Sequence, residues 1–167
     1  MEIIQILIRA LQFLWTLLIT ALIGNVIANN RNGHMASINF AMFVAVLSWL
    51  ALLYGLVAAF IESIAIPVAM IVLDGLAVLF TFISAVVLAA KLTAVNCGGN
   101  FHNKGSGWIG FGSSNTEKRC REIQASTAFM WFLFASFAAS LALAAIGFRR
   151  MGGSMRSSRP TMSQVRV

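Results

Sequence analysis

Four long apolar runs, separated by shorter polar segments, are the main pattern along the chain. They cover about residues 3–28, 38–61, 66–91 and 123–148. A helix of about 20 residues, rising 1.5 Å per residue, crosses a hydrocarbon core of about 30 Å, so each run is long enough to span a membrane. The turn between the second and third runs is very short, which makes these two runs an antiparallel hairpin. The pattern predicts an all-α membrane protein, a four-transmembrane-helix antiparallel bundle that occupies residues 1–148.

The third run contains an acid that needs a partner. The 23 residues between Pro67 and Lys91 include one ionisable side chain, Asp74. Pro67 suits the first turn of a helix, where its missing N–H would have no partner anyway. An acid inside a membrane span is costly unless another group receives it. We therefore expect the other three helices to supply polar groups at the level of Asp74.

Candidate partners for Asp74 follow from counting along the runs. Asp74 lies seven residues beyond Pro67, which places it roughly 10–12 Å below the membrane edge on the side of the termini. Polar side chains form one stripe along the first run at three- and four-residue steps, namely Arg9, Gln12, Thr16 and Thr20. Tyr54 in the second run and Ser140 in the fourth fall near the same level. The intramembrane polar candidates are therefore Asp74, Tyr54, Thr16, Ser140 and Arg9.

Three interpretations of these polar groups remain open. One is an interhelical contact between Asp74 and its neighbours that fixes the packing of the bundle. Another is a proton or substrate route through a small transporter or channel that uses Asp74. Transport usually needs more than one intramembrane carboxylate, which favours the packing interpretation. A role toward lipid headgroups or in regulation is the third interpretation.

Composition supports the membrane class and excludes others. Hydrophobic residues make up 59% of the chain and charged residues 10%, far below the roughly 25% charged residues of soluble domains. The net charge of +7 is concentrated in the loops and the C-terminal tail, so anionic lipid headgroups are the expected acidic partner and nucleic acid is not. The first run is longer than the apolar part of a signal peptide and has no basic segment before it, so we expect it to remain as a span.

The sequence contains no pattern typical of catalysis or of cofactor binding. No nucleophile–base pair, metal-ligand cluster or paired carboxylates occur, so we expect no enzyme activity, no catalytic residue, no metal and no cofactor. The glycine-rich stretch at residues 105–112 lacks the strand-then-helix context of a phosphate-binding loop. We expect Trp108, Ile109 and Phe111 in that stretch to dip toward the membrane interface, where aromatic residues settle. His34 is expected in a solvated loop.

The two cysteines orient the chain where the positive charges do not. The termini side and the loop side each carry six of the 12 basic residues. Cys97 and Cys120 share the loop predicted over residues 92–122, and disulfides persist in oxidising compartments. We therefore expect a disulfide, stabilising by about 3 kcal/mol, in a loop outside the cell, with both termini in the cytoplasm. The alternative is two free thiols in a cytosolic loop.

The C-terminal tail, residues 149–167, is expected to be a disordered, basic, cytoplasmic segment. It contains no acid, and its arginines suit binding to anionic inner-leaflet lipid. Phosphorylation of the two serines between two of these arginines would offset most of the tail's charge and release its distal part, which makes an electrostatic switch the functional hypothesis. The alternative is that the arginines only fix topology. The residues in question are Arg149, Arg150, Arg156, Ser157, Ser158 and Arg159.

An ordered series of short motifs resembles the fungal non-classical export protein 2 family, tetraspan proteins of the MARVEL (membrane-associating) type. The motifs lie at residues 39–43, 53–55, 60–62 with Pro67, 73–74 with 81–82, Cys97, 119–121 with 124–125, and 161–165. The resemblance implies a plasma-membrane protein that organises furrow-like, eisosome-associated domains, responds to sphingolipid, and has a link to non-classical protein export. It implies eisosome-type scaffold proteins as partners and no catalytic residue. The Ala- and Ser-rich fourth run also permits close lateral packing, including a homo-oligomer.

Overall fold

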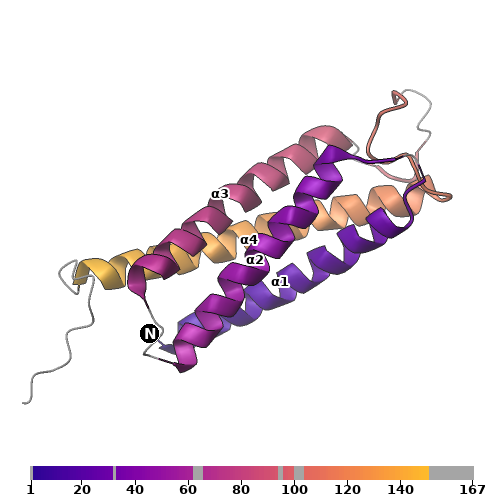
Figure 1. Cartoon of the computed structure of the whole chain (residues 1–167). Helices are drawn as coiled ribbons and strands as arrows, with labels where there is room; N and C mark the ends of the chain where they lie inside the picture. Colours follow the sequence, from indigo (N-terminus) through magenta and orange to yellow (C-terminus); the bar gives the residue numbers. More distant parts are fainter. Residues whose placement is uncertain (1, 32, 62–65, 94–95, 100–103, 151–167) are drawn as a thin grey trace, which may run out of the picture.

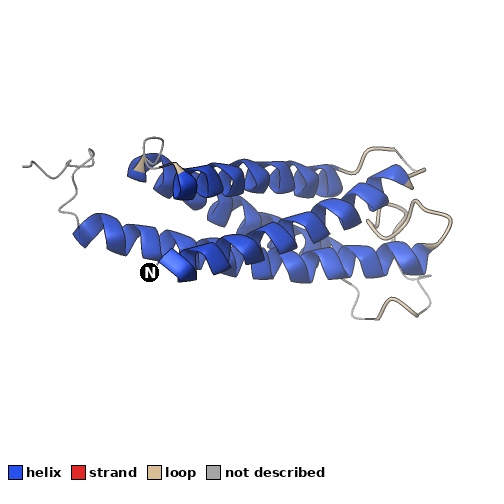
Figure 2. Ribbon diagram, turned by 90° about the horizontal axis from the view of Figure 1, so that it is seen from below, coloured by secondary structure: helices blue, strands red, loops and turns tan. Residues whose placement is uncertain are grey.

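The structure is a computed structural model, and it describes residues 2–31, 33–61, 66–93, 96–99 and 104–150. Four helices make up most of this part: α1 (Glu2–Ala28), α2 (Ala36–Phe60), α3 (Pro67–Leu92) and α4 (Thr116–Arg150). Figures 1 and 2 show the helices side by side along one long axis, and the described residues contain no strand. The predicted all-α fold with four long apolar helices is confirmed.

The four helices form a ring in which each one packs against two neighbours. The contacts join α1 to α2, α2 to α3, α3 to α4, and α4 back to α1. In the described part of the chain, the diagonal pairs α1–α3 and α2–α4 make no close backbone approach. Consecutive helices run in opposite directions, so the start of α1 and the end of α4 lie at one end of the bundle (Figure 1). The connection from α3 to α4 lies at the opposite end.

The distribution of side chains is inverted relative to a water-soluble bundle. Large apolar side chains face outward, as in Leu50, Leu79 and Phe132, which are 58%, 52% and 52% exposed. Polar side chains such as Gln12 and Thr81 are completely buried. A surface of this kind suits lipid tails, and all four helices are long and apolar enough to cross a membrane. The chain is therefore a multi-pass membrane protein.

The interior has two halves of different chemistry. The half near the α3–α4 connection is mainly an apolar core that includes Ile19, Ile23, Leu88, Met130 and Leu133. The half near the start of α1 buries charged and amide side chains, which the next subsection describes. The interior is therefore mostly apolar in one half of the bundle, whereas a polar network lies inside the other half.

Helix α4 begins at Thr116, seven residues before the predicted start at residue 123. The side-chain oxygen of Asn115 accepts a hydrogen bond from the Lys118 amide at 2.9 Å and so caps the first turn. Two ion pairs at i,i+4 spacing, Lys118–Glu122 and Arg121–Glu117, also favour helix here. The prediction was wrong at this point because it equated the helix with its apolar run, whereas α4 extends beyond that run as a charged helix.

The α3–α4 connection folds back on the bundle. Cys97 and Cys120 are joined by a disulfide, as predicted. Trp108 is only 7% exposed, and its indole Nε1 donates a hydrogen bond of 2.6 Å to the carbonyl oxygen of Leu92 in the last turn of α3. Ile109 is 4% exposed. Trp108 thus satisfies a carbonyl at the end of α3, and both residues cover the end of the core. Their place near the membrane interface stays a prediction.

Candidate functional site

Asp74 lies inside the bundle, and both of its carboxylate oxygens accept hydrogen bonds. Its side chain is 1% exposed. The Arg9 guanidinium binds it in a bidentate manner, with Nη1 donating to Oδ1 and Nη2 donating to Oδ2, each at 2.9 Å. The Ser140 hydroxyl donates to Oδ2 at 2.7 Å. Helices α1, α3 and α4 thus meet at one carboxylate.

Gln12 extends this contact one helical turn further along α1. Its side-chain oxygen accepts a hydrogen bond from Arg9 Nη1 at 2.9 Å, and its Nε2 donates to the backbone carbonyl of Ser136 at 3.2 Å. Gln12 is completely buried. Arg9, Gln12, Asp74 and Ser140 therefore form one connected set of contacts, which we call the Arg9–Asp74 network.

The remaining helix of the bundle, α2, contributes space rather than a hydrogen bond to the network. Gly55 on α2 faces the Arg9 guanidinium so closely that a Cβ atom at this position would lie 2.5 Å from Arg9 Cζ. That distance is shorter than any normal contact. Any larger residue at position 55 would therefore force the guanidinium to shift away from its place beside α2.

Replacing Gly55 by alanine is expected to lower the free energy of unfolding by about 1–3 kcal/mol, because the new methyl group displaces a guanidinium that Asp74 holds in place. Gly75 on α3 supplies the matched control, since a Cβ atom added there would have no neighbour within 4 Å. Gly75→Ala should leave the melting temperature in detergent unchanged or raised. Equal melting temperatures for the two variants would contradict the close-packing argument.

The Arg9–Asp74 pair bridges a diagonal of the ring. Arg9 belongs to α1 and Asp74 to α3, two helices that make no close backbone approach in the described residues. Arg9 is 5% exposed, so two opposite charges face each other away from water. A buried ion pair stabilises only when its geometry is good and its other hydrogen-bonding groups are satisfied, and this pair meets both conditions. The pair fixes how α1 and α3 are spaced across the interior.

The remaining predicted polar residues lie beside the network or outside the described part. Thr16 donates its hydroxyl to the carbonyl oxygen of Gln12 at 2.6 Å. The Tyr54 hydroxyl accepts a hydrogen bond of 3.3 Å from the amide of Ile66, just before α3. Arg149 and Arg150 belong to the last turn of α4. Three tail positions, Arg156, Ser157 and Ser158, lie outside the described residues, as does Arg159.

Arg119 is a buried residue that sequence reasoning did not select. It is 2% exposed, and its guanidinium donates to the carbonyl oxygens of Ile109 and Val26, both at 3.0 Å. It also approaches the sulfur of Met35 at 3.4 Å. It therefore ties the start of α4 to the loop, to the end of α1 and to the start of α2. Its place directly before Cys120 was the available signal, because the disulfide anchors this turn.

The Arg9–Asp74 network is neutral overall, and its charged groups find their hydrogen-bond partners inside the bundle. Within the described ranges, no group of three or more His, Cys, Asp or Glu side chains is placed to hold a metal ion. The network binds one carboxylate to one guanidinium and supplies both with further hydrogen-bond partners from within the bundle. Such an arrangement positions helices.

Comparisons with known proteins agree with this architecture. The family described as MARVEL, membrane-associating domain, matches residues 2–143. Non-classical export protein 2 of Saccharomyces cerevisiae is 32% identical over 95% of this chain and 95% of its own length. Non-classical export protein 102 of Candida albicans is 36% identical, over 96% of this chain and 97% of its own. No solved structure matches the chain. The chain therefore belongs to the MARVEL family of membrane-associating proteins and, within it, to the non-classical export protein 2 family.

Proposed function

We propose that the chain is a plasma-membrane tetraspan that organises lipid and protein domains. The observation that carries this proposal is the inverted bundle. Its charged groups are neutralised inside, in the Arg9–Asp74 network, while its outer surface presents large apolar side chains to lipid. A rigid body of this kind influences the lipids and proteins packed around it.

Clusters of aromatic rings on the outer surface support the same role. Phe82 on α3 packs against Trp131 and Phe134 on α4, with ring centroids 5.8 and 5.4 Å apart. On the other side of α4, Phe132 packs against Trp15 of α1 at 5.2 Å. Phe82, Trp131 and Phe132 are 44%, 38% and 52% exposed. Paired rings lose little conformational freedom on contact and give lipid chains, or a second copy of this protein, a firm surface to pack against.

The alternative function, a small transporter or channel, requires that Asp74 exchange its partners during transport. Both oxygens of Asp74 are bound to groups from α1 and α4, and Arg9 neutralises its charge. These contacts favour the packing role over the transport role. Ion-dependent uptake into liposomes that contain the purified protein would support the transporter instead.

The finer parts of the proposal rest on the family. Relatives carry the name non-classical export protein, so a link to export without a signal peptide is proposed here as well. We extend the proposal to eisosome-associated domains, to eisosome-type scaffold partners and to a response to sphingolipid. The disulfide favours placing the α3–α4 connection outside the cell and both termini in the cytoplasm.

Fluorescence microscopy in Saccharomyces cerevisiae tests this function. The tagged chain, expressed in place of its relative, should gather in stable patches of the plasma membrane that overlap a tagged eisosome scaffold. Inhibition of sphingolipid synthesis should change the fraction of protein in these patches. An even distribution over the plasma membrane, unaffected by the inhibitor, would contradict the proposal.

The basic tail yields a separate prediction about inner-leaflet lipid. Each arginine near an anionic surface contributes roughly 1 kcal/mol, and a phosphate adds about −1.5 to −2 charges. A peptide of residues 149–167 should therefore bind anionic vesicles in a salt-sensitive way. The same peptide phosphorylated at Ser157 and Ser158 should bind at least about tenfold more weakly in a vesicle sedimentation assay. Equal binding of the two peptides would leave the arginines only a topology role.

A further inference from the structure

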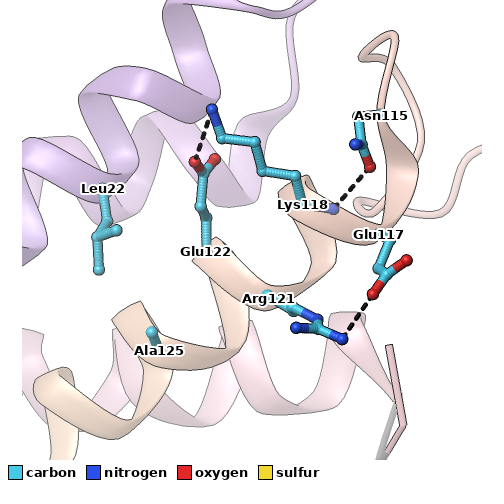
Figure 3. Close-up of a pocket in the computed structure, with 7 residues that line it drawn as sticks. All are labelled: Leu22, Asn115, Glu117, Lys118, Arg121, Glu122 and Ala125. Atoms are coloured by element: carbon cyan, nitrogen blue, oxygen red, sulfur yellow. Dashed lines mark hydrogen bonds and ion pairs between the residues drawn. The ribbon is translucent and has the colours of Figure 1, made fainter. Parts of the chain in front are cut away.

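A pocket of about 470 Å³ opens at the surface between α1 and the first turns of α4, at the end of the bundle opposite the termini. Figure 3 shows its charged residues on consecutive turns of α4, with Leu22 of α1 and Ala125 of α4 beside them. The Arg9–Asp74 network does not reach this pocket, since its residues lie in the other half of the bundle.

The lining of the pocket changes from charged to apolar along the membrane normal. Glu117, Lys118, Arg121 and Glu122 occupy the part nearer the loops. Ala125 lies one turn deeper, about 6 Å below Arg121 by helix rise, and Leu22 faces it from α1. A phospholipid has the same order, with a charged headgroup at the surface and apolar chains below it. The pocket therefore has the polarity of a lipid that enters from the leaflet on the loop side.

The charges in the pocket include both signs in equal number. Lys118 approaches Glu122 at 3.8 Å, and Arg121 approaches Glu117 at 2.5 Å. The side chains of Lys118 and Arg121 are 62% and 67% exposed, so these ion pairs are weak and can exchange partners. Glu122 is held more firmly, because Asn25 donates a hydrogen bond of 2.6 Å to it. The pocket thus offers mobile cations beside a fixed anion.

We propose that this pocket binds the headgroup of a zwitterionic phospholipid. The lipid phosphate accepts hydrogen bonds from Lys118 and Arg121, its ammonium group lies against Glu117 and Glu122, and its acyl chains begin at Leu22 and Ala125. An anionic lipid fits less well, because the formal charge of the four side chains sums to zero and its headgroup offers no cation to Glu117 or Glu122. The site goes beyond the proposed function and depends neither on the tail nor on domain organisation.

Native mass spectrometry of the full chain tests the site. The protein in detergent is mixed with equal amounts of phosphatidylcholine, phosphatidylglycerol and diacylglycerol of identical acyl chains. Phosphatidylcholine should be retained about tenfold more than either of the others, because it alone offers a phosphate and an ammonium group. Equal retention of phosphatidylcholine and phosphatidylglycerol would overturn the proposal.

Two pairs of substitutions assign the preference to the pocket. Glu117→Gln with Glu122→Gln leaves two uncompensated cations, so the preference should reverse and phosphatidylglycerol should be retained more. Lys118→Ala with Arg121→Ala should lower retention of phosphatidylcholine about tenfold. The control, Arg31→Ala with Lys91→Ala, removes the same charge from exposed positions at the same end of the bundle and should change nothing. Equal losses in the test and control pairs would also overturn the site.

Discussion

Replacing Asp74 by leucine is expected to lower the free energy of unfolding by about 3–5 kcal/mol, because the change leaves the Arg9 guanidinium buried without its counter-charge. The loss also removes the acceptor for the Ser140 hydroxyl. Leucine is branched at Cγ like aspartate and is larger, so the cost comes from stranded polar groups rather than from a cavity. The shift in the melting temperature of the purified protein in detergent measures this effect.

Substitution by asparagine separates charge from shape. Size and hydrogen-bonding capacity, taken alone, would favour a mild effect for Asp74→Asn, since the amide keeps the size and much of the hydrogen-bonding capacity. The bidentate contact with Arg9 changes that expectation, because asparagine places an NH₂ donor against a guanidinium that has only donors. Asp74→Asn should therefore be nearly as damaging as Asp74→Leu. Ser140→Ala, which removes one hydrogen bond, should cost only about 1 kcal/mol.

The double variant Arg9→Met with Asp74→Leu shows whether the ion pair itself is the cause. It removes both charges at once, so it should recover most of the stability lost in Asp74→Leu alone. If the Asp74→Leu and Asp74→Asn variants were each as stable as the parent protein, the packing role of Asp74 would be contradicted. Stable variants that lose an ion-coupled flux in liposomes would instead favour the transporter.

Much of the fold and part of this network could be predicted from the sequence, for identifiable reasons. The apolar runs show the helices because a membrane span needs about 20 apolar residues. Asp74 stands out because an acid in such a run needs a partner. Counting residues from the membrane edge placed Ser140, and the polar stripe that contains Arg9, at the level of Asp74, because the rise per residue of a helix is constant. Depth alone, however, could not choose among Tyr54, Thr16 and Arg9.

The rest of the site depends on information that depth and composition do not contain. Gly55 matters because of where the Arg9 guanidinium turns after leaving α1, which is a property of the packed bundle. Gln12 was visible as part of the polar stripe, but its bond to a backbone carbonyl of α4 depends on the rotation of both helices. The early start of α4 was missed because its first turns are charged, and the prediction relied on hydropathy.

Loss of the Cys97–Cys120 disulfide is expected to be the second large effect, lowering the free energy of unfolding by about 3 kcal/mol. The bridge closes a segment with a sequence separation of 23, and the unfolded chain gains freedom when the bridge is absent. Its loss also releases the turn that carries Arg119, whose guanidinium holds the ends of three segments together. The double variant Cys97→Ser with Cys120→Ser should therefore melt at a lower temperature than the parent protein.

Reducing agent supplies the control for this prediction and a test of orientation. The parent protein should lose stability when reductant is added, whereas the double serine variant should not respond, since it has no bond to reduce. An unchanged melting temperature in both cases would mean that the buried contacts of Arg119 and Trp108 hold this end without the bridge.

In intact cells, a membrane-impermeant maleimide should label the parent protein only after reduction. Labelling that requires permeabilised membranes would place the loop in the cytoplasm and reverse the proposed orientation, because reduced thiols outside the cell need no such treatment.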